Sequence, residues 1–190
     1  MYPNQRNRRL RESKAIRALV RENQLSVNDL MLPLFVTEGS QVKEAIQSMP
    51  GIYRISLDLL KEEVKNAWSM GIKAVLIFVK VPDKLKNNTG SEAINPKGLM
   101  QRAVREIKSS VPEILVMTDV ALDPYSSLGH DGIVEKKKVL NDPTLEILSQ
   151  MALSHAKAGA DFVAPSDMMD GRVLRIRTTL EEAGLHSIGI

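Results

Sequence analysis

The chain has 190 residues, of which 43% are hydrophobic, with 26 basic and 23 acidic side chains and a net charge of +3. This composition excludes a disordered chain and allows one sizeable hydrophobic core. No run of about 18 uninterrupted apolar residues occurs, and no apolar stretch follows the arginine-rich N-terminus, so we expect no membrane partner, no secretory signal and a cytoplasmic location.

A basic arm opens the chain. Residues 1–22 hold seven basic and two acidic side chains, a net charge of +5, which leaves −2 on residues 23–190. The arm lacks the interleaved aromatic residues and reading motifs of nucleic-acid-binding segments, so no nucleic-acid partner is expected. Ile16, Leu19 and Val20 form an apolar stripe too small to fold alone, which favours packing on a neighbouring subunit. We therefore divide the chain into an arm, 1–22, and one domain, 23–190.

Apolar runs and helical patterns alternate in the first half of the domain. Residues 29–36 and 74–79 are predicted strands, because their apolar residues are continuous, as in strands covered on both faces. Between them we expect a loop over 41–55 and a helix from Ser56 or Asp58 to Gly71. The polar segment 82–96 is expected to form a mobile loop over a site, with its GSEA motif acting as a lid or only as a turn.

The same alternation continues to the end of the chain. A helix is predicted over 98–110 and a third strand over 114–120. Asp142 and Pro143 suit the start of a helix that ends at Gly159, and His155 on this helix is expected to pack or to lie on the surface. A fourth strand over 161–164, a helix over about 173–183 and the start of a fifth strand at 187–190 complete the pattern.

Strands that alternate with helices require parallel, right-handed crossovers, so a doubly wound sheet and an eight-stranded barrel are the candidates. No G-x-G-x-x-G follows the first strand, which weakens the nucleotide-binding version. Polar clusters instead follow the third and fourth strands, the layout of a (β/α)8 TIM barrel. We therefore expect an α/β fold, a TIM barrel truncated to about its first four βα units plus the start of strand five, behind an N-terminal arm.

The loop after the third strand concentrates the polar residues, in the sequence MTDVALDPYSSLGHDGIV over 117–134. Asp119, Asp123 and Asp131 lie within thirteen residues, and a buried carboxylate is strongly disfavoured unless a cation or hydrogen-bond donor pairs with it. The alternative is a solvated loop with ordinary turns at Asp123-Pro124 and Asp131-Gly132. With no cysteine and no closely spaced histidines, any metal would be bound by oxygen or by imidazole.

Several short motifs give the chain a specific resemblance. The motifs are Arg8–Arg11, Val20–Glu22, Asp29–Leu30, Pro33–Val36, Met49–Gly51, Gly90–Ala93, Asp119–Val120, Gly129–His130 with Gly132, and Ala164–Arg172. The last of these, APSDMMDGR at 164–172, is the most specific. On these motifs the chain resembles the N-terminal part of the delta-aminolevulinic acid dehydratases, also called porphobilinogen synthases.

The resemblance implies a lyase of heme and porphyrin biosynthesis that condenses two 5-aminolevulinate molecules into porphobilinogen with loss of two waters. It implies a homo-octamer, in which the arm wraps a neighbouring barrel. In the family two lysines at the ends of barrel strands five and six bind the substrates as Schiff bases. These positions lie beyond Ile190, so we expect the 190-residue chain alone to be inactive.

The resemblance also implies roles for the polar residues. Asp119 is expected to orient the substrate amine or a catalytic lysine, and Ser166 to form a hydrogen bond in the pocket. Asp123 and Asp131 are expected to bind the substrate amine or a hydrated cation. Zinc-dependent members have three cysteines where this chain has Ala121, Asp123 and Asp131, and carboxylates favour Mg²⁺ or K⁺ over Zn²⁺. The chain thus resembles the zinc-independent, aspartate-containing branch, and no zinc is expected.

Three alternatives stay open. Asp167, Asp170 and Arg172 form either a helix-capping ion-pair cluster or part of the catalytic apparatus. The chain could be another Schiff-base barrel lyase, which inactivity of a complete version toward 5-aminolevulinate would reveal. It could also be a non-catalytic truncated or assembly fragment.

Overall fold

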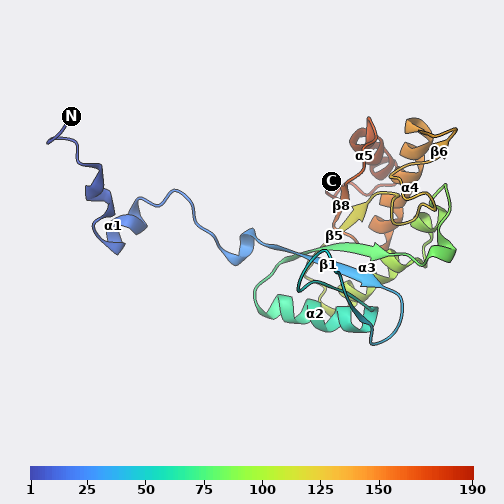
Figure 1. The fold of residues 1–190 in the computed structure, drawn as a ribbon, viewed down its shortest axis with the longest axis horizontal. Coiled ribbons are helices and arrows are strands. Elements are labelled where there is room, and N and C mark those ends of the chain that lie inside the picture. The colour runs from blue at the N-terminus through green and yellow to red at the C-terminus, as the bar shows by residue number, and fades with distance from the viewer.

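The computed structural model describes residues 1–190, with an extended arm that projects from the folded body (Figure 1). The arm contains a short 3-10 helix, η1 (Asn7–Arg11), and α1 (Lys14–Leu19), and neither buries a residue. The Ser13 hydroxyl caps α1 by accepting a hydrogen bond from the Ile16 amide at 3.1 Å. Leu19 at the end of α1 is 86% exposed, so the apolar residues of the arm have no partner within the chain.

The body is built on a six-stranded sheet in the order β2-β3-β1-β4-β5-β8. Four long strands are parallel neighbours and correspond to the four predicted strands, whose existence is confirmed. Their apolar residues alternate between the two faces of the sheet: one set, such as Val75 and Ile77, is buried in the core, and the other, such as Leu76 and Phe78, is only half-buried. The four strands are β1 (Met31–Thr37), β4 (Ala74–Lys80), β5 (Leu115–Val120) and β8 (Phe162–Pro165).

The prediction of a loop over 41–55 is wrong, because the segment forms a short hairpin of β2 (Lys43–Ala45) and β3 (Tyr53–Ile55). β3 pairs in parallel with β1, with Phe35 opposite Arg54. Three-residue strands are too short to show a period of two in the sequence. Pairing with the free edge of β1 stabilises them instead, by satisfying backbone donors and acceptors.

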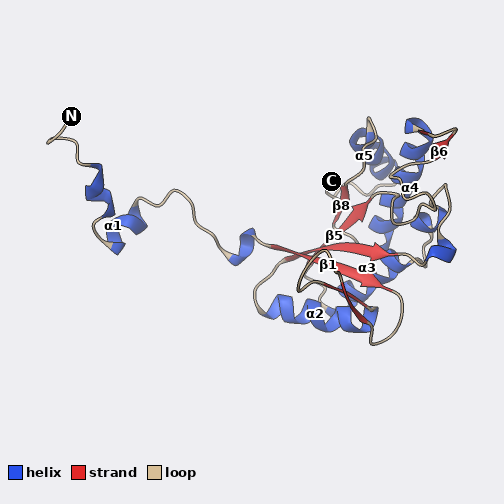
Figure 2. Ribbon diagram, in the orientation of Figure 1, coloured by secondary structure: helices blue, strands red, loops and turns tan.

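Four helices cover the sheet in chain order, as the ribbon shows (Figure 2). α3 packs between α2 and α4, and α5 packs on α4. The boundaries agree with prediction to within two residues, but α4 begins at Asn141, before the predicted Asp142 and Pro143. The helices are α2 (Leu57–Ser69), α3 (Leu99–Ser110), α4 (Asn141–Ala158) and α5 (Arg172–Glu182).

His155 connects the helix layer to the sheet. Its Nδ1 lies 3.0 Å from Thr118 Oγ1 on β5, and the side chain is fully buried. Burial lowers the pKa of His155 to about 3, so the imidazole is neutral at ordinary pH. The interpretation of His155 as a packing residue is confirmed.

The polar segment 82–96 is anchored along its length. It contains two short 3-10 helices, η3 (Asp83–Leu85) and η4 (Ser91–Ile94), and Asn87 is hydrogen-bonded through its backbone to Tyr125 and Ser127. Gly90 has a φ of 61°, and a Cβ there would lie 2.9 Å from a methyl carbon of Leu122. The GSEA motif therefore forms a tightly packed turn.

The sheet remains open, with β2 at one edge and β8 at the other. Only a single parallel bridge, between Phe162 and Gly189, marks the predicted fifth strand beside β8. The observed architecture is thus an α/β fold with a mostly parallel sheet, and no closed barrel is formed by these residues. None of its helices combines the length and the apolar character needed to cross a membrane.

Candidate active site

A cleft of about 510 Å³ lies at the carboxyl ends of the long strands. All four site residues predicted from the sequence line it, so the structure brings them together. The cleft is also lined by three cationic side chains, Arg54, Lys80 and Lys86, and by two aromatic ones, Phe35 and Phe78. Its lining residues are Phe35, Arg54, Phe78, Val79, Lys80, Val81, Lys86, Asp119, Asp123, Pro124, Asp131 and Ser166.

The pairing of β5 with β8 places the first two site residues side by side. Asp119 on β5 is opposite Ala164 and Val120 is opposite Pro165, so Ser166 follows directly after the paired segment. The Ser166 hydroxyl donates a hydrogen bond of 2.5 Å to Asp119 Oδ1, and its amide donates to the Val120 carbonyl at 3.2 Å. Two adjacent strands therefore fix the geometry of this pair.

The Asp119 carboxyl is buried, and its environment changes its acidity. The pKa of Asp119 is raised from 3.8 to about 6, chiefly by burial and in part by the nearby carboxylates of Asp123 and Asp131. The hydrogen bond from Ser166 opposes this rise because it stabilises the charged form. Asp119 therefore exchanges its proton close to neutral pH, as a group that binds an amine or transfers a proton requires.

Asp123 and Asp131 face the same cleft from the loop that follows β5. Partial burial raises the pKa of Asp123, and the nearby Asp131 raises it further, whereas Lys86 opposes the rise. Three carboxylates thus converge with too little cationic charge to neutralise them. The loop is buried at Ala121, Leu122, Tyr125 and Ser126, whereas Asp123 and residues 127–130 are exposed, so the loop is partly solvated.

The cationic side chains of the cleft form ion pairs of their own. Glu44 on β2 accepts from Arg54 Nη1 at 3.3 Å and from Lys80 Nζ at 3.1 Å, and Lys86 pairs with Asp83 at 2.9 Å. The sequence analysis missed Arg54, because it lies in the segment expected to be a loop and belongs to no motif. Only the pairing of β3 with β1 brings it to the cleft.

The structure also decides between the two interpretations of the APSDMMDGR motif. Asp167 does not line the cleft: its carboxylate accepts from the Met169 amide at 2.7 Å and lies 3.5 Å from Arg172 Nε. Burial raises the pKa of Asp167, and the Met169 amide and Arg172 oppose that rise. Asp167 and Arg172 therefore form an ion pair at the start of α5, whereas Asp170 is exposed and unpaired, and no side chain caps the helix.

The predicted cation ligands Asp123 and Asp131 supply two carboxylates. The structure contains no cluster of three or more His, Cys, Asp or Glu side chains arranged to bind a metal. Magnesium keeps several water ligands and is often bound through one or two carboxylates, so this pair fits a hydrated hard cation. Ala121 supplies no ligand atom, and the chain offers no thiolate.

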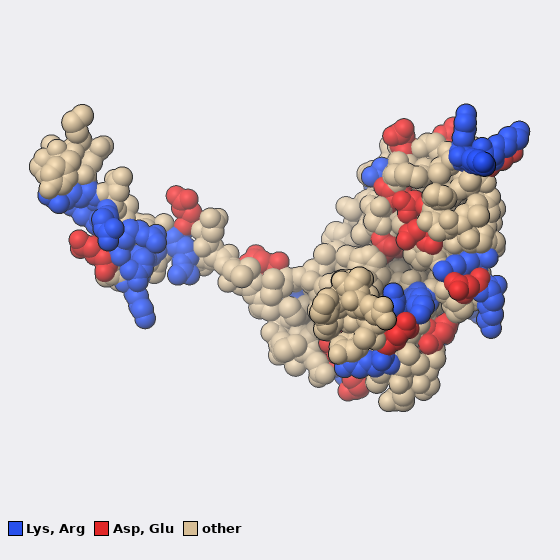
Figure 3. All heavy atoms as spheres, in the orientation of Figure 1, with Lys and Arg blue, Asp and Glu red and all other residues tan.

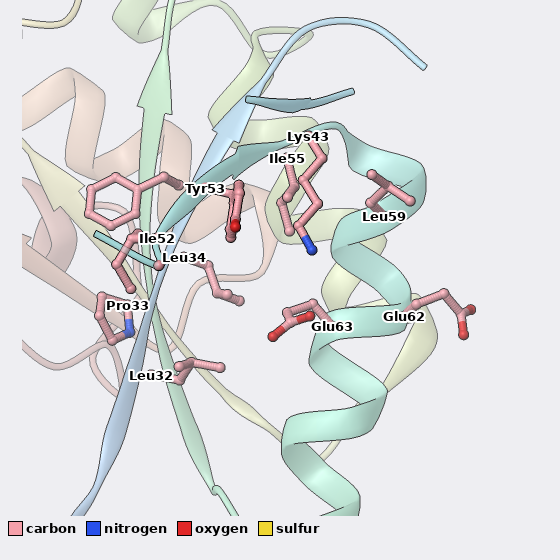
Figure 4. A pocket seen from close by; sticks show the side chains of 12 residues that line it. Leu32, Pro33, Leu34, Lys43, Ile52, Tyr53, Ile55, Leu59, Glu62 and Glu63 are labelled. Atoms are coloured by element: carbon pink, nitrogen blue, oxygen red, sulfur yellow. The ribbon is translucent and has the colours of Figure 1, made fainter. Parts of the chain in front are cut away.

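A second hollow, of about 350 Å³, lies between the edge of the sheet and α2 (Figure 4). Leu32, Leu34 and Ile52 supply its apolar lining, while Glu62 and Glu63 project from α2. None of the predicted site residues reaches it. The candidate active site is therefore the cleft at the strand ends.

Comparison with known proteins gives one consistent result. The sequence profile of a family described as delta-aminolevulinic acid dehydratase matches residues 4–190. Over 187 residues the chain is 50% identical to a delta-aminolevulinic acid dehydratase of Methanothermus sociabilis, covering 98% of this chain and 58% of that protein. It is 45% identical over 185 residues to one of Chlamydia pneumoniae, covering 97% and 56%.

The fold agrees with a solved structure as well. A crystal structure of delta-aminolevulinic acid dehydratase (porphobilinogen synthase) from Toxoplasma gondii ME49, in complex with the reaction product porphobilinogen, superimposes with a TM-score of 0.93 at 46% identity. The match covers 96% of this chain and 52% of that one. The chain therefore spans a little over half the length of these relatives.

The raised pKa of Asp119 predicts a cost in stability that depends on pH. The folded-state pKa is about 6 against 3.8, so the contribution of Asp119 to stability is greatest below pH 3.8, falls between about pH 3.8 and 6, and is lost above that range. Asp119→Asn should therefore raise the free energy of unfolding at pH 8, by at most about 3 kcal/mol, and leave it nearly unchanged at pH 4. Urea unfolding at both pH values measures this difference.

The matched control is Asp170→Asn, which removes an exposed carboxylate that does not line the cleft. It should change stability little at either pH. An equal gain for Asp119→Asn at pH 4 and pH 8 would show that ionisation of Asp119 is not the cause.

Proposed function

The chain belongs to the delta-aminolevulinic acid dehydratase family, and on that basis we propose that it acts as part of a porphobilinogen synthase. The reaction joins two molecules of 5-aminolevulinate into porphobilinogen with loss of two waters. Support comes from the family match over residues 4–190 and from the similarity to a family member bound to porphobilinogen. The protein would then be a lyase of heme and porphyrin biosynthesis.

The observation that carries this proposal is the hydrogen-bonded pair of Asp119 and Ser166, beside Asp123 and Asp131 in one cleft. At neutral pH 5-aminolevulinate carries an ammonium group and a carboxylate. The ammonium group is a strong donor to carboxylates, and the Ser166 hydroxyl holds the Asp119 carboxylate in a fixed orientation. The proposed role of these residues is to bind and orient the substrate amine.

Asp119 would also hold or release a proton during the reaction. Its pKa of about 6 lies close to the operating pH, where a general acid or base is most effective. A bound ammonium group would favour the charged carboxylate and lower this pKa. Binding of the substrate and the protonation of Asp119 would therefore be coupled.

We further propose that the open sheet forms the first half of a (β/α)8 barrel in a longer protein, which supplies the two Schiff-base lysines. A Schiff-base lysine must be a free amine with a depressed pKa. Both lysines that line the cleft are engaged in ion pairs, Lys80 with Glu44 and Lys86 with Asp83. Residues 1–190 by themselves would then bind 5-aminolevulinate without converting it.

For the cation, we propose the zinc-independent, aspartate-containing branch of the family. Asp123 and Asp131 would hold a hydrated Mg²⁺, with K⁺ as the second candidate, because carboxylate oxygen suits hard ions. When bound, the cation would supply positive charge that offsets the repulsion among the three carboxylates of the cleft. No residue of the cleft offers the sulfur ligands that favour zinc.

The choice of cation has a direct test in an active protein that contains this chain. A zinc-selective chelator should leave porphobilinogen formation unchanged, whereas removal of magnesium and potassium should reduce it. Asp123→Ala with Asp131→Ala should abolish the response to magnesium, and Asp170→Ala, which removes an exposed carboxylate, should preserve it. Loss of activity with the zinc chelator, restored by zinc alone, would contradict the carboxylate assignment.

The absence of a Schiff-base lysine from residues 1–190 is tested by trapping. Borohydride reduction of the chain in the presence of 5-aminolevulinate, followed by intact-mass measurement, should give no stoichiometric adduct. Lys80→Arg should likewise give no adduct. A single adduct mapped to one lysine would refute this part of the proposal and identify that lysine as catalytic.

The arm is proposed to bind a second copy of the protein, as part of a homo-oligomer that the family suggests is an octamer. Its support is geometric: the arm projects from the body and leaves Leu10, Leu19 and Val20 exposed (Figure 1). Such residues gain stability by being buried against a neighbour. The seven basic side chains of the arm would then face the acidic body of the next subunit.

Deleting residues 1–21 should lower the mass of the assembly, because the apolar contacts of the arm would be lost. Light scattering on an active protein with and without the arm measures the change. A matched variant, Leu19→Ser with Val20→Ser, keeps the charge of the arm and should weaken the assembly in the same direction. An unchanged mass after the deletion would rule out this role.

A further inference from the structure

A small hairpin beyond the aspartate loop has an unusual turn. It consists of β6 (Val134–Glu135) and β7 (Lys138–Val139), joined by Lys136 and Lys137. Both turn residues have positive φ, 48° and 65°. Two-residue hairpin turns of this kind favour Asn-Gly, because a side chain with a Cβ is strained at positive φ. Two lysines therefore occupy positions at which asparagine and glycine would make the turn more stable.

The hairpin also concentrates unpaired positive charge. Lys136, Lys137 and Lys138 follow one another, and none of the three forms an ion pair or a side-chain hydrogen bond. Glu135 is the only acidic residue of the hairpin. The space-filling view shows basic side chains projecting at the upper right, over β6 (Figure 3). Neighbouring ammonium groups repel one another, which adds to the cost of the strained turn.

A hollow of about 540 Å³ lies at this turn. It combines apolar side chains with cationic ones and has no carboxylate in its lining, in contrast to the aspartate cleft. Leu128 at its rim is 54% exposed. The lining residues are Leu128, His130, Val134, Lys136, Lys137 and Val139.

The base of the hairpin is held rigidly, so the hollow is preformed. Asn88 makes two hydrogen bonds with the backbone of Val134, at 2.9 Å to its carbonyl and 3.0 Å from its amide. The Ile133 amide donates to Thr144 Oγ1 at 3.0 Å. Gly132 is packed so closely that a Cβ there would lie 2.7 Å from Val139 Cγ1. A preformed site loses little conformational entropy when a ligand binds.

We propose that this hollow binds an organic phosphate, with Lys136 and Lys137 contacting the phosphate and Leu128, Val134 and Val139 packing against the organic group. A dianion neutralises two adjacent ammonium groups and forms charge-assisted hydrogen bonds with them. The apolar lining distinguishes such a ligand from inorganic phosphate. Strained residues that persist at a ligand-facing position are typical of binding sites, where function offsets the loss of stability.

The proposal is tested by isothermal titration calorimetry of the purified chain with 1-naphthyl phosphate, which carries both a dianion and an apolar group. One molecule should bind per chain, and inorganic phosphate should bind at least tenfold more weakly. Lys136→Asn with Lys137→Gly should weaken binding of 1-naphthyl phosphate at least tenfold. The same variant should raise the melting temperature, because it relieves the strain of the turn.

Two control variants separate specific binding from general charge effects. Lys136→Arg with Lys137→Arg keeps the charge and should retain binding. Lys65→Asn with Lys84→Asn removes two positive charges elsewhere and should also retain it. The proposal is overturned if 1-naphthyl phosphate does not bind, if inorganic phosphate binds equally well, or if Lys136→Asn with Lys137→Gly leaves the affinity unchanged. Equal loss of binding in the Lys65 and Lys84 variant would also overturn it.

Discussion

The pairing of β5 with β8 is the constraint on which the site depends. Because side chains alternate along a strand, Thr118 and Asp119 point to opposite faces of the sheet. Thr118 bonds to His155 on the helix side, while Asp119 bonds to Ser166 on the other side, just past the end of β8. A shift of one residue in this register would exchange the two faces and separate the carboxylate from its serine. The packing of α4 therefore supports the geometry of the cleft.

The same site reduces the stability of the fold. Burying Asp119 beside the carboxylates of Asp123 and Asp131 places like charges together, which disfavours the ionised forms of Asp119 and Asp123. A ligand with an ammonium group would relieve this repulsion, whereas a purely anionic ligand would not. The unfavourable charge arrangement would thus give the cleft the preference for an amine or a hydrated cation that we propose. The lysine hairpin at 134–139 carries positive charge instead, which favours an anionic ligand.

The sequence predicted the elements that depend on long local patterns of residues. Continuous apolar runs predicted β1, β4, β5 and β8, and the family resemblance assigned Asp119 and Ser166 to one predicted site. The β2 and β3 hairpin was missed because each strand has three residues, and the hairpin is stabilised by the pairing of β3 with the edge of β1. Arg54 reaches the cleft only through that pairing, so no local pattern could have identified it. The start of α4 was predicted at Asp142 and Pro143, whereas the helix begins at Asn141. The prediction differed because Asp followed by Pro is typical of a helix start.

The central claim is that Asp119 binds the amine of 5-aminolevulinate. Its most direct test is the titration of the Asp119 carboxyl carbon by NMR, with and without saturating 5-aminolevulinate. We predict a midpoint near pH 6 in the free protein and a lower one with the ligand, because the ammonium group stabilises the carboxylate. Levulinate, which has the same carboxylate and ketone but no amine, should leave the midpoint in place. An unchanged midpoint with 5-aminolevulinate, or the same shift with levulinate, would contradict the account.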